Sequence, residues 1–96
     1  MLNVEKCFSG RCMRVSVVGE LDSITSPELE RELQDLDNVD EVVLDLKDLA
    51  YMSSAGLRVI MGLKRRLAGR PLKLENIGVE VREVLDMTGS SKLLGI

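Results

Sequence analysis

The stretch that decides the fold runs from residue 42 to residue 69 and reads VVLDLKDLAYMSSAGLRVIMGLKRRLAG. Its first part, residues 42–46, is a short apolar and β-branched run, typical of a central strand that is covered on both faces. A connection over residues 47–53 follows. Apolar residues then recur at helical spacing over residues 55–68, before Gly69 ends the helix. A strand, a connection and a helix in this order form the repeating unit of an α/β protein.

The N-terminal residues predict an antiparallel β-hairpin. Apolar and polar residues alternate on both sides of Ser9-Gly10, a dipeptide suited to a two-residue turn. That turn would place Cys7 opposite Cys12 and Val4 opposite Val15. We expect reduced thiols rather than a disulfide, because disulfides are rare in cytosolic proteins. Two cysteines in a chain without histidine make no zinc site.

The remaining segments continue the alternation of strands and helices. A hydroxyl followed by proline at Ser26-Pro27 predicts a helix start, and that helix is expected to end at Asp37-Asn38. A strand over residues 72–77, a helix over residues 81–88 and a short final strand over residues 92–96 follow. We therefore predict an α/β fold in one domain spanning residues 1–96. Its sheet is mixed and mostly parallel, with four or five strands, helices and an N-terminal β-hairpin.

Composition excludes several classes of function. The net charge of −3 argues against a dedicated nucleic-acid-binding protein, which would carry a basic excess. No segment approaches the roughly 18 continuous apolar residues of a membrane span, and the N-terminal residues do not read as a secretory signal. We therefore expect a cytoplasmic protein with neither nucleic acid nor membrane insertion among its interactions.

The chemistry of the chain concentrates where the long helix begins, at Ser53-Ser54-Ala55-Gly56. The first turn of a helix has unpaired N–H groups and a partial positive charge, which makes it a seat for a phosphate. Small residues after the serines leave room for a partner's backbone. The plainer interpretation is that a serine here caps the helix, and residue chemistry alone favours that.

Enzymatic interpretations have little support. The Gly-x-Ser-x-Gly elbow of serine hydrolases is missing, and a chain without histidine lacks their usual base. The phosphate-binding loop Gly-x-x-x-x-Gly-Lys-[Ser/Thr] is also missing. We predict no catalytic residue, no metal site and no cofactor.

The order of five segments resembles the STAS domain family, and within it the bacterial anti-sigma-factor antagonists. The similarity runs from about Val4 to Leu94, and its most specific part is the Ser-Ser-Ala-Gly-Leu sequence after a buried strand. The five segments are Gly19-Glu20-Leu21-Asp22, Ser26-Pro27-Glu28-Leu29, Val43-Leu44-Asp45-Leu46, Tyr51-Met52-Ser53-Ser54-Ala55-Gly56-Leu57 and the helical run from Val81 to Gly89.

The resemblance implies a protein that switches between binding partners. The serine two positions before the motif glycine, Ser54 here, is the phosphorylation site of that family. The kinase is the cognate anti-sigma factor, which binds the unphosphorylated form and thereby releases its sigma factor; a PP2C-type phosphatase reverses the modification. Ser53 occupies a position that is commonly aspartate, and is therefore a second candidate acceptor. A monomer or weak dimer is implied.

The expected partner surface surrounds the two serines. Its residues are Asp22, Met52, Ser53, Ser54, Ala55, Gly56 and Arg58. Asp22 follows a strand and is placed near Ser54 by the clustering of loops at strand ends; forming a turn or capping a helix is an equal alternative. Arg58, with Arg65 and Arg66, gives the long helix a basic face that is either solvated or in contact with an acidic partner. Met52 and Leu57 are apolar, and such residues are more often core than contact.

Two further points stay open at the level of sequence. Asp45 lies within an apolar strand and needs a partner if it is buried, for either a structural or a functional reason. The runner-up function keeps the STAS fold without phosphorylation, as a constitutive subunit of a lipid transporter or a signalling scaffold.

Overall fold

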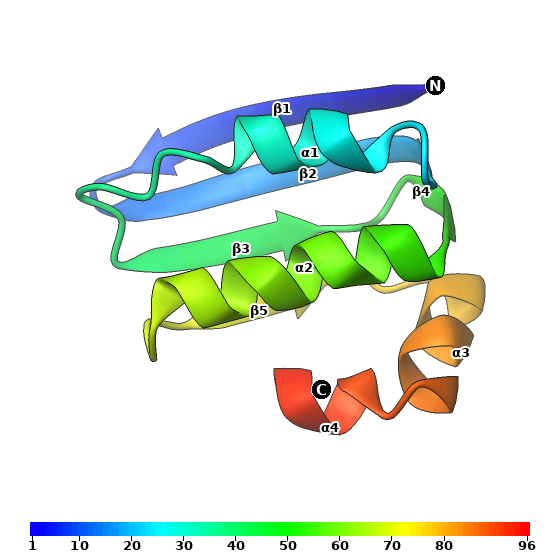
Figure 1. Cartoon of the computed structure of the whole chain (residues 1–96). Coiled ribbons are helices and arrows are strands. Elements are labelled where there is room, and N and C mark those ends of the chain that lie inside the picture. Colours follow the sequence, from blue (N-terminus) through cyan, green and yellow to red (C-terminus); the bar gives the residue numbers. More distant parts are fainter.

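The computed structural model describes residues 1–96 and contains one five-stranded sheet and four helices (Figure 1). The elements, in chain order, are β1 (Leu2–Ser9), β2 (Cys12–Leu21), α1 (Ser26–Glu32), β3 (Glu41–Asp45), β4 (Leu49–Met52), α2 (Ser54–Leu67), β5 (Leu72–Glu75), α3 (Val79–Met87) and α4 (Ser90–Leu94). No helix is both long and apolar enough to cross a bilayer.

The sheet is mixed and mostly parallel, as the sequence predicts. Its strand order is β1-β2-β3-β5, and the short β4 pairs with the far end of β2. β1 runs antiparallel to β2, whereas the β2–β3, β2–β4 and β3–β5 pairs are parallel. The α/β prediction with an N-terminal hairpin is therefore confirmed.

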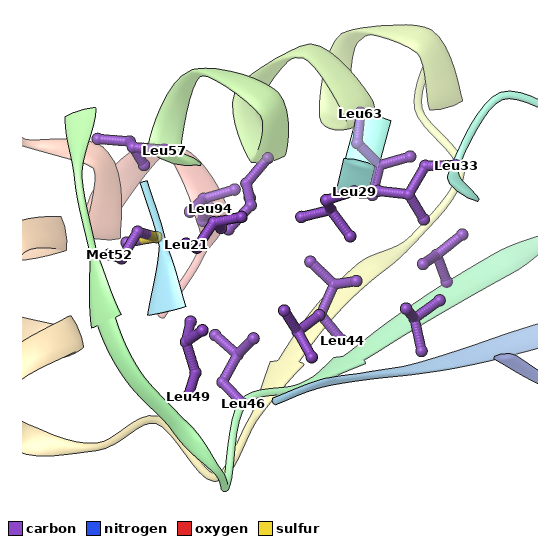
Figure 2. Packing of buried hydrophobic residues seen from close by; sticks show 14 of the residues in the cluster. Leu21, Leu29, Leu33, Leu44, Leu46, Leu49, Met52, Leu57, Leu63 and Leu94 are labelled. Carbon is purple, nitrogen blue, oxygen red and sulfur yellow. The ribbon is translucent and has the colours of Figure 1, made fainter. Parts of the chain in front are cut away.

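The core lies between one face of the sheet and the helices. In Figure 1, α1 and α2 lie side by side across that face. Leu44 of β3 packs with Leu29 of α1, Leu33 just after α1 and Leu63 of α2 in this layer (Figure 2). All four side chains are almost completely buried, and burying a leucine side chain contributes about 1.5–3 kcal/mol.

The other face of the sheet is polar, so the prediction of a central strand covered on both faces is wrong. Along β3, Val42 and Leu44 point into the core, while Val43 and Asp45 lie on the opposite face. Val43 is buried there although its register neighbours are Arg14 of β2 and Lys73 of β5. Long charged side chains cover apolar surface with their aliphatic stems, which is why an apolar run could arise on an uncovered face.

Asp45 is partnered within this polar face. Asn76 donates a hydrogen bond to its carboxylate at 3.0 Å, and the amide of Lys47 donates another at 3.1 Å. These bonds, with the nearby guanidinium of Arg14, hold the pKa of Asp45 below its usual range. Arg14 also pairs with Glu75 at 2.7 Å. Asp45 thus has a structural role in tying β2, β3 and β5 together.

The hairpin turn lies one residue later than predicted. Ser9 pairs with Cys12, so the turn residues are Gly10 and Arg11, and Cys7 faces Arg14 rather than Cys12. Gly10 has φ of +60°, and a type II′ turn requires that conformation at its first central position. Val4 accordingly pairs with Val17. The predicted apolar and polar faces of the hairpin are unchanged, because the register moves by two residues. Both cysteines are free thiols.

Three predicted elements have different bounds or types. The expected final strand at 92–96 is instead α4, which lies between left-handed glycines at both caps and buries Leu94 in the core. β4 lies within the expected connection. Its two end residues are buried and its two middle residues exposed, so it lacks the alternation that marks a strand. α1 ends at Glu32, before the predicted Asp37-Asn38, although Leu36 beyond it is buried.

Arginines of α2 and its C-terminal turn hold the segment after α1. Arg66 donates from Nη2 to the carbonyls of Leu33 and Gln34 at 2.7 and 2.8 Å. Arg70 donates from Nη1 to the carbonyls of Leu36 and Val39 at 3.1 and 2.6 Å. These carbonyls follow the last turn of α1, where carbonyls lack partners within the helix; only that of Leu36 also accepts a backbone amide, from Val39 at 3.3 Å.

Replacing Arg66 by Ala removes this link, and we expect the free energy of unfolding to fall by about 1.5–3 kcal/mol, the range for hydrogen bonds that involve a charged group. Arg65→Ala is the matched control, because the exposed side chain of Arg65 makes no hydrogen bond or ion pair within the chain; it should change stability by less than about 0.5 kcal/mol. Urea unfolding followed by circular dichroism measures both. Equal losses would contradict the structural role of Arg66.

Candidate functional site

The candidate site lies where β2 and β4 end and α2 begins. Leu21, the last residue of β2, pairs with Met52, the last residue of β4. The amide of Ser53 donates to the carbonyl of Leu21 at 2.8 Å. The loops that follow both strands are therefore joined at the start of α2, and Figure 2 shows Leu21, Met52 and Leu57 packed beneath them.

The two adjacent serines have different roles. Ser53 is the N-cap of α2: its backbone is extended, and its Oγ accepts from the amide of Gly56 at 3.4 Å. Its side chain is half-buried. Ser54 is the first residue of the helix; it is exposed, and its hydroxyl makes no hydrogen bond to the protein. The capping role therefore belongs to Ser53, and the hydroxyl of Ser54 is free to react or to bind.

Asp22 organises the loop between β2 and α1. Its Oδ1 accepts from the amides of Ile24 and Thr25 at 2.9 and 3.0 Å. The amide of Asp22 in turn donates to Thr25 Oγ1, whose hydroxyl donates to the carbonyl of Glu20 at 2.8 Å. The Thr25 amide is the main cause that lowers the pKa of Asp22. Asp22 thus builds the turn, and its other oxygen, Oδ2, accepts no hydrogen bond from the chain.

Gly56 allows α2 to approach the end of β2. A Cβ on Gly56 would lie 2.6 Å from Cγ of Leu21 and 3.1 Å from its carbonyl oxygen. The first distance is closer than non-bonded carbon atoms tolerate, and the second is an unusually tight contact. Gly56 is buried, so its missing side chain serves the interior and leaves no space for a partner.

The structure divides the predicted surface residues into two groups. Met52 is only 1% exposed and packs in the core with Leu57, so it is unavailable to a partner, like Gly56. Apolar packing at the end of β4 accounts for its burial. The accessible group consists of exposed Ser54 and Arg58 together with half-buried Asp22, Ser53 and Ala55.

Two exposed apolar residues beside the site were not predicted. Ile24, in the loop that Asp22 organises, is 82% exposed, and Tyr51 of β4 is 50% exposed. The isoleucine within the polar segment Asp22-Ser23-Ile24-Thr25 can be read from the sequence as an exposed apolar residue, but a single one does not by itself mark a contact surface. Tyr51 gave no such signal, because β4 itself was not recognised.

A groove adjoins the site between α1 and α2 and has a volume of about 410 Å³. Ala55 and Arg58, both predicted, line it beside several residues that were not. The lining residues are Ser23, Ser26, Pro27, Glu30, Ala55, Arg58, Val59, Gly62 and Arg65.

Comparison with known proteins identifies the family. Residues 3–96 match the STAS domain. The chain belongs to the STAS domain family. A Staphylococcus aureus protein named anti-sigma-B factor antagonist is 31% identical to it, over 99% of this chain and 92% of the relative. The relative's name describes a regulatory protein, which agrees with the expectation that this STAS domain is not an enzyme.

Solved STAS structures share the fold. An anti-sigma factor antagonist from Mycobacterium paratuberculosis superposes with a TM-score of 0.89 at 24% identity, covering 97% of this chain and 82% of that one. The Bacillus cell fate determinant SpoIIAA in its phosphorylated form superposes with a TM-score of 0.74 at 18% identity, covering 96% and 86%. At these identities the likeness establishes the arrangement of strands and helices alone.

Two glycines of α2 provide a test of how the STAS site is packed. Gly56→Ala should destabilise the protein by about 1–3 kcal/mol, because the new methyl group overlaps Leu21. Gly62→Ala should stabilise it by up to about 1 kcal/mol, because alanine favours a helix and the nearest side-chain atom is 3.8 Å away. Thermal and urea unfolding measure both. Effects of the same sign would contradict the described packing.

The turn that Asp22 forms should make the free energy of unfolding depend on pH in the acidic range. Folding lowers the pKa of Asp22, so its contribution to stability is complete above the ordinary carboxyl pKa of about 4 and is lost as the pH falls through the lower, folded value. Asp22→Asn keeps an oxygen acceptor but does not titrate. We therefore expect its free energy of unfolding to fall less steeply below about pH 4 than that of the wild type, measured by urea unfolding at several pH values. An unchanged slope would contradict this role.

Proposed function

We propose that this STAS protein is an anti-sigma-factor antagonist controlled by phosphorylation of Ser54. In its unphosphorylated form it binds an anti-sigma factor and so releases the sigma factor. The observation that carries the proposal is the exposed, unbonded hydroxyl of Ser54 at the first turn of α2. Membership in the STAS family and the name of the Staphylococcus aureus relative support it.

The structure favours Ser54 over Ser53 as the acceptor. A kinase must reach the hydroxyl, orient it and remove its proton. Ser54 is exposed and engaged in no hydrogen bond, whereas Ser53 is half-buried and holds the first turn of α2 through the amide of Gly56. Phosphorylating Ser53 would disturb the cap on which the helix start depends.

A phosphate on Ser54 is compatible with the fold. The group adds roughly −1.5 to −2 charges at neutral pH, and the first turn of α2 contains no acidic residue. The partial positive charge of the helix N-terminus favours the anion. The phosphorylated form of SpoIIAA has a similar fold. The modification therefore changes the surface and leaves the core unaltered.

The same phosphate opposes a complex. Ser54 is exposed at the start of α2, as are Arg58 one turn further along this helix and Ile24 in the loop after β2. A partner surface that fits closely over a hydroxyl must also accommodate a bulky anion after phosphorylation. Each ~1.4 kcal/mol of repulsion reduces affinity about tenfold, so a modest misfit is enough to change partners.

The complete cycle needs two partners, with ATP as the phosphoryl donor of the kinase, and this chain itself needs no cofactor. The anti-sigma factor serves as the serine kinase, and a PP2C-type phosphatase restores the hydroxyl. All the chemistry belongs to these partners, and residues 1–96 act as one domain in the cytoplasm, as a monomer or weak dimer.

Phosphorylation by the anti-sigma factor of the same genome tests the proposal. Incubation with ATP should add one phosphate, which mass spectrometry locates on Ser54. Ser54→Ala should accept none, and Ser53→Ala, the matched control, should still be modified because only a cap worth about 1 kcal/mol is lost.

Binding completes that test. The phosphorylated protein should bind the anti-sigma factor at least about tenfold more weakly than the unphosphorylated one. The proposal is wrong if Ser54→Ala is modified as fully as the wild type, or if phosphorylation leaves the affinity unchanged. The latter result favours a constitutive STAS subunit of a transporter or scaffold.

A further inference from the structure

The groove between α1 and α2 extends the proposed partner surface along the length of α2. Four of its lining residues, Ala55, Arg58, Gly62 and Arg65, recur at intervals of three or four and so form one face of the helix. The groove is open at Gly62, where a Cβ would meet nothing closer than the guanidinium of Arg65 at 3.8 Å. Ala55 at its end adjoins Ser54.

The arginines of α2 and of the turn after it have two different roles. Arg66 and Arg70 donate to carbonyls after α1 and are committed to the fold. Arg58 and Arg65 line the groove, and neither forms a hydrogen bond or an ion pair within the chain. The basic face predicted from the sequence therefore separates into one structural arginine, Arg66, and two free guanidinium groups that share one groove.

The two sides of the groove carry opposite charges. Arg58 and Arg65 are on the α2 side, and Glu30, which also has no ion pair, is on the α1 side. The two arginines are seven residues apart, which corresponds to about 10.5 Å along a helix axis. A helix lying along α2 with acidic residues seven positions apart would present its carboxylates at the same spacing.

We propose that this groove binds an acidic helix of the anti-sigma factor, with two carboxylates on Arg58 and Arg65 and a basic residue facing Glu30. The proposal rests on the proposed function, because it names the part of that partner which docks beside Ser54. The small residues Ala55 and Gly62 allow the incoming helix to approach α2, and guanidinium–carboxylate pairs fix its register.

Phosphorylation acts on the same groove. Arg58 is four residues after Ser54, one turn along the same face of α2. A phosphate on Ser54 pairs with that guanidinium and withdraws it from the partner. Release of the partner then has two causes, the misfit of the phosphate and the loss of one groove cation.

Charge reversal within α2 tests the groove. The unphosphorylated protein is titrated with the anti-sigma factor of the same genome by calorimetry. Arg65→Glu should weaken binding at least about tenfold, the range for loss of a close interfacial ion pair. Lys64→Glu is the matched control: it is exposed on the neighbouring position of the same helix, outside the groove, and should bind within about twofold of the wild type. Thermal melts confirm that both variants fold.

Filling the groove gives a second measurement that does not change its charge. Gly62→Phe should abolish binding, and Gly62→Ala should leave it within about twofold, because a methyl group leaves most of the groove open. If the wild type binds while Arg65→Glu and Gly62→Phe bind as their controls do, the groove proposal is overturned and the proposed function stands. If the wild type does not bind the anti-sigma factor, the proposed function fails and the groove proposal fails with it.

Discussion

The contact between the start of α2 and the end of β2 is the constraint on which the rest of the structure depends. The carbonyl of Leu21 accepts a hydrogen bond from the amide of Ser53. The side chain of Leu21 lies close against Gly56. Without a Cβ at Gly56 the helix can begin directly above the sheet edge. That approach fixes the direction of α2 across the sheet, and therefore also the width of the groove that α2 forms with α1.

The same contact explains how two neighbouring serines come to differ. A helix that begins against a strand end needs a cap whose side chain points back to its own first turn. Ser53 provides it, so the next hydroxyl along the chain, that of Ser54, has no partner and faces solvent. A single serine at this point could serve as a cap or as an acceptor. The pair separates the two tasks, so a modification at Ser54 leaves the cap in place.

Much of the framework could be predicted, because it depends on local periodicity. The central strand and the long helix after it follow from the spacing of apolar residues. A serine cap at the start of that helix follows from the preferences of helix ends. The hairpin register could not be predicted as easily, because two dipeptides, Ser9-Gly10 and Gly10-Arg11, both suit a tight turn. The choice between them depends on pairing along all of β1. β4 and α4 are shorter still, and tertiary contacts decide their form.

The candidate site shows the same division between local and long-range information. The position of Ser54 at a helix start can be predicted from the residues around it in the sequence. Met52 and Gly56 are near neighbours of Ser54 in the chain, yet they face the interior, which only the packing against Leu21 reveals. The groove depends on α1 and α2 meeting, and nothing in either helix alone indicates whether an arginine will find a carbonyl, as Arg66 does, or remain free.

The two arginines of the groove are significant because the protein as a whole is acidic and many of its basic side chains are already paired. The chain carries 13 basic and 16 acidic residues, and the ion pairs use Lys6, Arg11, Arg14, Lys73 and Arg82. Arg66 and Arg70 are held by carbonyls. Two unengaged guanidinium groups in one groove therefore create a local positive field on a negatively charged molecule. Such a field guides an acidic segment to one place on the surface, and a phosphate introduced one turn away is well placed to cancel part of it.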